Sequence, residues 1–109
     1  MAQLEGNGGA KCTVTQTIDA SGAPVVNLIG EIDISNAHQI GRTLERLIGS
    51  STDHLVIDLS ALAFMDSAGI AMLLRAVAGA ASVTIRNPST VVRRILECTG
   101  LDDVLPIEQ

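Results

Sequence analysis

The chain has 109 residues, 47% of them apolar, and a formal net charge of −5. This length fits a single domain, and the apolar content suffices for one hydrophobic core. The acidic balance, the lack of any cluster of Lys and Arg, and the presence of Phe64 as the single aromatic residue argue against direct binding of nucleic acid or of a membrane surface.

Cysteine and histidine spacing gives no sign of a metal or another cofactor. Cys12 and Cys98 lie far apart, and neither has a companion at the spacing of a metal site. We expect both to be free, buried thiols, as in the reducing cytoplasm. The N-terminus has no apolar segment of the kind found in secretory signals, which agrees with a cytoplasmic location.

The first part of the chain predicts a flexible segment followed by a hairpin. Residues 1–10 are polar and glycine-rich, so the folded domain is expected to cover 11–109. Alternating β-branched and polar residues over 11–18 predict a strand, and a turn sequence over 19–24 leads to a second strand over Val25–Ile29. Strands joined in this way are expected to pair antiparallel.

Helical and strand patterns alternate after the hairpin. Three helices are expected, with N-termini at Ser35, at the Asp66–Ser67 pair and at Asn87, and the tail fits a short helix or a strand. Such alternation implies right-handed crossovers and a mostly parallel sheet. We therefore expect an α/β fold with four to five strands, an N-terminal antiparallel hairpin and three to four helices. The later strands are predicted at His54–Leu59 and Ser82–Arg86, and the buried stripes of the second and third helices at Ile70, Leu73, Leu74 and Val77, and at Val91, Val92, Ile95 and Leu96.

Two acidic loops are expected at one edge of this sheet. The first contains Glu31 and Asp33, and the second contains Asp66 and Ser67. In parallel sheets, functional groups collect in loops beyond the carboxyl ends of the strands. These two loops are therefore the candidate functional site.

Ser67 allows three interpretations. As a helix cap, it or Asp66 would accept a hydrogen bond from the N–H groups that open the second helix. As a nucleophile it would need a GxSxG turn and a nearby base, but the sequence reads MDSAG, and neither His38 nor His54 is expected beside it. As a phosphate acceptor it would be accessible, and the helix dipole with free N–H groups would accommodate the phosphate. An enzyme is therefore not expected, whereas capping and phosphate acceptance are compatible.

The second helix also offers an apolar surface. Opposite its predicted core stripe it carries Ala68 and Met72, where a surface helix is normally polar. Small residues and Met suit adaptable contacts, so this side is predicted to form a partner-binding patch. Burial of the same side by the third helix or the tail is the alternative.

Three stretches of the chain resemble the bacterial anti-sigma-factor antagonist family, the STAS domain. They read GEIDISNA at 30–37, LVIDLSALAFMDSAGIAMLL at 55–74 and NPSTVVRRILECTGLDDVL at 87–105. The resemblance extends from about Lys11 to the C-terminus. It implies that an anti-sigma factor that is also a serine kinase phosphorylates Ser67. The unphosphorylated chain would bind this kinase and release the sigma factor, and a phosphatase would reset the switch.

The resemblance also assigns residues to the partner surface. Asp66 corresponds to the loop aspartate before the phosphorylated serine, and Asp33 to the acid that ends the G-E-x-D motif. Many family members have a second serine where this chain has Ala68, which leaves Ser67 as the only hydroxyl in the loop. The complete predicted partner-binding set is Glu31, Asp33, Asp66, Ser67, Ala68, Gly69 and Met72, whereas Ser35, Ser60, Ser89 and Thr90 are predicted to be structural.

A second function stays open on the sequence alone. A STAS module could bind a nucleotide, or serve as a subunit of a lipid-transport or stress-signalling complex, without a phosphorylation cycle. The same loop would then be an interaction surface. A monomer or weak dimer is expected, and the sequence identifies neither the kinase nor the sigma factor.

Overall fold

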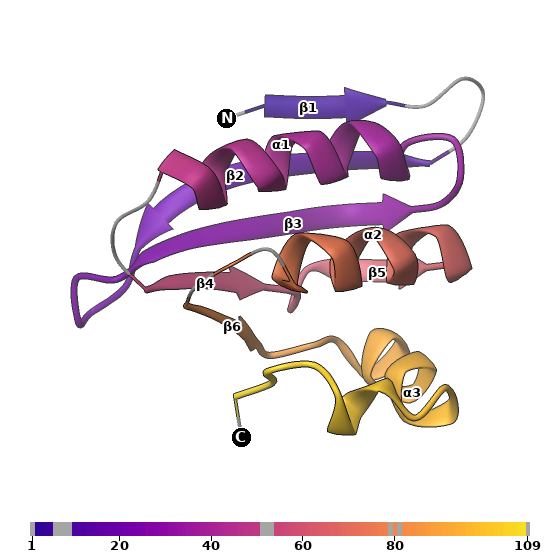
Figure 1. Ribbon diagram of the computed structural model, residues 1–109. Coiled ribbons are helices and arrows are strands. Elements are labelled where there is room, and N and C mark those ends of the chain that lie inside the picture. The colour runs from indigo at the N-terminus through magenta and orange to yellow at the C-terminus, as the bar shows by residue number, and fades with distance from the viewer. Residues whose placement is uncertain (1, 6–9, 51–53, 79, 81, 109) are drawn as a thin grey trace.

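A mixed sheet of six strands organises the molecule (Figure 1), for which a computed structural model describes residues 2–5, 10–50, 54–78, 80 and 82–108. The strands are β1 (Ala2–Glu5), β2 (Lys11–Ile18), β3 (Pro24–Ile32), β4 (Leu55–Asp58), β5 (Leu62–Met65) and β6 (Val83–Arg86). Their order is β1-β2-β3-β4-β6, with β5 paired to β3 outside this path. The first three pair antiparallel, whereas β3, β4, β5 and β6 pair parallel. The predicted α/β fold with an N-terminal antiparallel hairpin is confirmed.

Two strands, β1 and β5, are additions to the predicted set. The segment 1–10 was expected to be flexible, but residues Ala2–Glu5 within it pair with β2 through their backbone. β5 has two exposed residues between two buried ones, a pattern that does not alternate. β5 (LAFM) is apolar throughout and lacks the alternation on which strand prediction depends, whereas β1 (AQLE) alternates over only four residues.

The second strand of the hairpin is longer than predicted. β3 continues through Gly30 to Ile32, past the predicted end at Ile29. Gly30 has a φ of +120°, and a Cβ at this position would lie 2.3 Å from the carbonyl oxygen of Lys11, so only glycine fits here. The register with β5 shifts between Gly30 and Glu31. Beyond this irregularity, β3 leads into the first of the two predicted loops.

Three helices and one 3₁₀ turn pack around the sheet. They are α1 (Ala37–Ser50), α2 (Ser67–Ala78), α3 (Thr90–Cys98) and η1 (Leu101–Asp103). α1 and α2 lie side by side over the sheet (Figure 1), so close that a Cβ at Gly41 would lie 2.7 Å from Cγ of Met72. Within the described ranges, no helix is long and apolar enough to cross a membrane. The largest buried side chains of the shared core include Leu28, Ile32, Ile40, Leu44, Ile57, Leu73 and Leu96.

The third helix begins later and is less buried than predicted. Its N-cap is Ser89, whose hydroxyl oxygen accepts from the N–H of Val92 at 3.3 Å. Asn87, the predicted cap, instead has a left-handed φ of +51°. Of the predicted buried stripe, Val92 and Leu96 are buried, Ile95 is half-buried and Val91 is 50% exposed. A second apolar side of α3 therefore lies outside the core.

The tail after α3 returns to the edge of the sheet. It forms η1 and then a single parallel bridge between Ile107 and Ile85. The guanidinium of Arg86 pairs with Asp19 and with Glu108, each at 3.2 Å. These ion pairs link the turn of the β2–β3 hairpin to the C-terminal end of the chain.

The two cysteines differ in burial. Cys12 is 1% exposed on β2, and burial raises the pKa of its thiol to about 11. Cys98 is exposed at the end of α3. Both thiols are free, but the prediction that both are buried is wrong for Cys98.

Candidate functional site

The two predicted loops begin side by side, at the carboxyl ends of β3 and β5. These strands pair in parallel, with Ile32 opposite Met65. The N–H of Asp66 donates to the carbonyl oxygen of Ile32 at 3.1 Å. Because Asp33 and Asp66 are the first residues after the two strands, the structure brings both acidic loops to one edge of the sheet.

Local hydrogen bonds hold the first loop in shape. The carboxylate of Asp33 accepts from the N–H of Ser35 at 2.8 Å and from its hydroxyl at 2.5 Å. These bonds, the hydroxyl first, lower the pKa of Asp33, and the backbone of Ala10 adds to the effect. Asn36 is 1% exposed and donates to the carbonyl oxygens of Glu31 and Ala10. The prediction that Ser35 caps the first helix is wrong, since its hydroxyl donates to Asp33.

Asp66 is the N-cap of α2. Its Oδ1 accepts from the N–H groups of Ala68 at 2.9 Å and of Gly69 at 3.1 Å. Gly69 is buried, and a Cβ there would lie 2.9 Å from Cβ of Met65. Ser67 thereby occupies the first helical position with an exposed side chain. Two of the N–H groups that a phosphate was expected to find free are already bonded to Asp66.

The hydroxyl of Ser67 differs from other serine hydroxyls in its bonding. In three other turns, a serine two residues after an aspartate donates both its N–H and its hydroxyl to that aspartate. In the Asp66 turn this position is Ala68, and the serine lies one residue earlier. Among the serines that the structure describes, Ser67 is the only one whose hydroxyl makes no hydrogen bond to the protein. The three turns are Asp19–Ser21, Asp33–Ser35 and Asp58–Ser60, with hydroxyl–carboxylate distances of 2.6, 2.5 and 2.6 Å.

Exposed apolar side chains accompany both loops, but they are not the predicted ones. Ile34 in the first loop is 81% exposed, and Phe64 just before the second loop is 42% exposed. Met72 is 3% exposed against α1, so its prediction as a surface contact is wrong. Ile34 and Phe64 were not among the residues predicted from the sequence. An isoleucine between Asp33 and Ser35 in a loop was nevertheless a usable signal, because loops are normally polar.

Within the described structure, the Ser67 hydroxyl makes no hydrogen bond to a base that could activate it. The two ring nitrogens of His54 form hydrogen bonds with the hydroxyls of Ser82 and Thr84. His38 is exposed on α1. Among the residues described, no group of three His, Cys, Asp or Glu side chains could hold a metal ion. Asp33 and Asp66 bring two carboxylates to this edge of the sheet, and Glu31 is exposed close to the end of β3.

The sheet topology and the paired loops define an α/β domain of the STAS type. A family model described as "Mlab, STAS domain" matches residues 16–106, most of the chain. The chain therefore belongs to the STAS domain family.

Several relatives are named as anti-sigma-factor antagonists, which confirms the resemblance in the sequence. The chain is 34% identical over 84 residues to the anti-sigma F factor antagonist of Lysinibacillus sphaericus, covering 71% of this chain and 70% of the relative. The crystal structure of an anti-sigma factor antagonist from Mycobacterium paratuberculosis is similar with a TM-score of 0.73 and 29% identity, covering 87% of this chain and 85% of that one. The phosphorylated form of SpoIIAA from Bacillus is similar with a TM-score of 0.55 and 26% identity, covering 89% and 92%.

Proposed function

We propose that this chain is an anti-sigma-factor antagonist whose binding to its partner is controlled by phosphorylation of Ser67. The observation that carries the proposal is the Ser67 hydroxyl, which is exposed and makes no hydrogen bond within the described structure. A kinase can therefore engage it without breaking an internal bond. The names of the relatives support the antagonist function, and one similar structure is of a phosphorylated form.

In the proposed cycle, the unphosphorylated chain binds an anti-sigma factor that is also a serine kinase, and the sigma factor is released. The carboxylates of Asp33 and Asp66 accept hydrogen bonds from their own loops, so their main role is to hold the docking surface in shape. Glu31 is exposed and is the acid best placed to pair with a basic group of the partner. Ser67 and Ala68 supply the contact at the start of α2, and buried Gly69 lets this helix lie close to the strands.

Phosphorylation would change the charge of this surface. A phosphoserine adds about −1.5 to −2 charges at neutral pH, directly beside Asp66, in a chain whose net charge is already −5. Docking would then require the partner to desolvate a dianion next to a carboxylate. Because about 1.4 kcal/mol corresponds to a tenfold change in affinity, a penalty of a few kcal/mol lowers affinity by orders of magnitude. A phosphatase that removes the phosphate restores binding.

The test is phosphate transfer by individual anti-sigma serine kinases of the source organism, with the modified residue mapped by mass spectrometry. Phosphate is expected on Ser67. Ser67→Ala should lose the label and keep kinase binding, whereas Ser67→Glu should lose binding. Ser60→Ala is the matched control, because Ser60 is also exposed but its hydroxyl donates to Asp58 at 2.6 Å. This control should be labelled normally.

Two outcomes would contradict the proposal. Phosphate on a residue other than Ser67 would remove its basis, as would a Ser67→Glu chain that binds the kinase as tightly as wild type. Absence of labelling together with co-purification of membrane subunits would instead favour the STAS interaction module without a phosphorylation cycle.

A further inference from the structure

A polar hollow lies between the helices α1 and α2, beside their closest contact. This contact is made by Gly41 and Met72, which also form part of the lining of the hollow. The hollow has a volume of about 260 Å³. A second hollow of about 190 Å³ adjoins it, because Glu45 and Arg75 line both. We call the larger one the α1–α2 pocket.

Cationic side chains gather at this pocket, although the net charge of the chain is −5. Arg75 comes from α2, and Arg42 comes from α1, one turn after His38. All three side chains belong to exposed residues. Neither guanidinium forms an ion pair or a hydrogen bond with a residue that the structure describes. Since Glu45 is the only acid among the lining residues, positive charge is in excess here.

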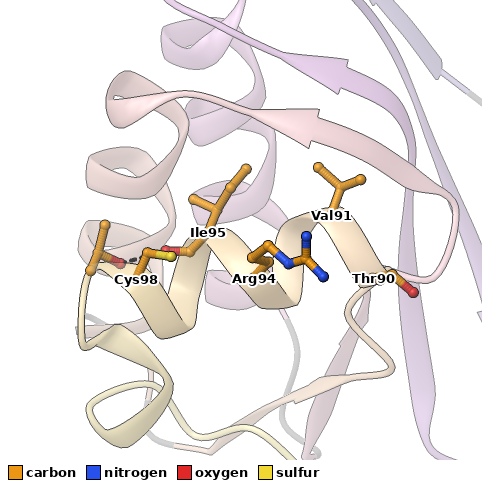
Figure 2. A pocket seen from close by; sticks show the side chains of 6 residues that line it. Thr90, Val91, Arg94, Ile95 and Cys98 are labelled. Atoms are coloured by element: carbon orange, nitrogen blue, oxygen red, sulfur yellow. Dashed lines mark hydrogen bonds between the residues drawn. The ribbon is translucent and has the colours of Figure 1, made fainter.

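The groove along α3 differs from the α1–α2 pocket in its chemistry. It is larger, about 520 Å³, and Figure 2 shows the apolar side chains of Val91 and Ile95 on it, with Arg94 supplying its charge. A single cation can hold an anion from one side only. Arg42 and Arg75 belong to different helices and can hold an anion between them.

We propose that the α1–α2 pocket binds a small phosphate-bearing molecule, with the phosphate held by Arg42, Arg75 and His38. A phosphate group has three terminal oxygens around one centre, so it can accept from three donors that arrive from different directions. A carboxylate offers two oxygens in one plane, which a single guanidinium already satisfies. The charge of a phosphate monoester, about −1.5 to −2 at neutral pH, also matches that of two arginines.

The size and lining of the pocket limit the rest of the ligand. The volume lies below the range of about 300–1,000 Å³ that is usual for drug-sized ligands. None of the described residues that line it is aromatic, so the pocket has no side chain on which a base could stack. We therefore expect a phosphate monoester that is smaller than a nucleotide.

The test is a titration of the full chain with glycerol 3-phosphate, followed by NMR at low ionic strength, where exposed charges are least screened. The amide signals of Gly41 and Met72 should shift in a saturable way, together with the Nε–H signals of Arg42 and Arg75. Arg42→Gln with Arg75→Gln should weaken binding roughly tenfold or more. Because both arginines are exposed and Gln is a comparable helix former, this variant should keep the fold.

The matched control is Arg46→Gln with Arg94→Gln. Both arginines are exposed and lie outside the pocket, and the pair removes the same total charge. It should bind glycerol 3-phosphate like wild type. Equal weakening in the two double variants would overturn the proposal, because the probe would then respond to the overall charge alone.

Other results would also overturn it. Succinate, a dicarboxylate, should bind more weakly than glycerol 3-phosphate, and equal or tighter binding would contradict a phosphate site. Ser67→Ala should bind the probe like wild type. Loss of binding in that variant, or shifts confined to the Ser67 loop, would place the phosphate elsewhere. None of these measurements needs a kinase, so they stand apart from the test of the proposed function.

Discussion

Replacing Asp66 with alanine tests whether its carboxylate holds the Ser67 loop and the start of α2 in shape. Asp66→Ala removes the acceptor for the N–H groups of Ala68 and Gly69, at 2.9 and 3.1 Å. Loss of an N-cap of this kind costs about 1 kcal/mol, and loss of the negative charge at the helix N-terminus adds about 0.3–1 kcal/mol. The free energy of unfolding should therefore fall by about 1–2 kcal/mol, which lowers the Tm of a domain of this size by at least about 4 °C.

Asp66→Asn is the informative comparison, because the amide oxygen still accepts both hydrogen bonds while the charge is lost. Urea denaturation should show a smaller loss for Asp66→Asn than for Asp66→Ala. Phosphate labelling of Ser67 should be slower in Asp66→Ala, since the first turn of α2 frays. Asp58→Ala removes the equivalent acceptor in the turn after β4 and should leave labelling unchanged. Equal stability of the two Asp66 variants would refute the capping argument.

Two further predictions concern the aspartate turns, one at Asp19 and one at Asp66. The pKa of Asp19 is lowered from 3.8 to about 2, first by the hydroxyl of Ser21, so its carboxylate stabilises the fold above about pH 4 and this contribution is lost as the pH falls toward 2. In urea denaturation, the stability difference between wild type and Asp19→Asn should narrow between pH 4 and pH 2, and parallel profiles would contradict this. Ala68→Ser places a hydroxyl two residues after Asp66, where it should donate to that carboxylate as in the other three turns. Mass spectrometry should then find phosphate on Ser67 alone, and comparable labelling of position 68 would show that internal bonding does not select the acceptor.

Local patterns in the sequence were sufficient to predict most of what positions the site. The bounds of β2 follow from its alternation of β-branched residues, and the strand–loop–helix order places two acidic loops at one edge of a parallel sheet. Asp66 as an N-cap follows from its position before an apolar helical repeat. These features depend on residues close together in the chain, which is why a single sequence reveals them.

The errors about burial concern which sides of a helix are covered. Helical periodicity shows that Met72 shares a side of α2 with Ala76, but not that α1 lies against that side. The contact is made possible by Gly41, 31 positions earlier in the chain. The reverse holds for α3, where the apolar residues Val91 and Ile95 were expected in the core and lie outside it. Coverage of this kind depends on long-range packing, which local spacing does not encode.

The occupied N-terminus of α2 determines how the proposed switch would work. A helix N-terminus normally stabilises an anion, but the carboxylate of Asp66 already accepts from the N–H groups of Ala68 and Gly69. A phosphate on Ser67 could accept from the N–H groups of Ala68 and Gly69 only by displacing this cap, at a cost of about 1 kcal/mol, and against the repulsion of a neighbouring carboxylate. Its more favourable position is outward, in water. Phosphorylation would therefore leave the fold intact and place its whole charge on the surface where the partner docks.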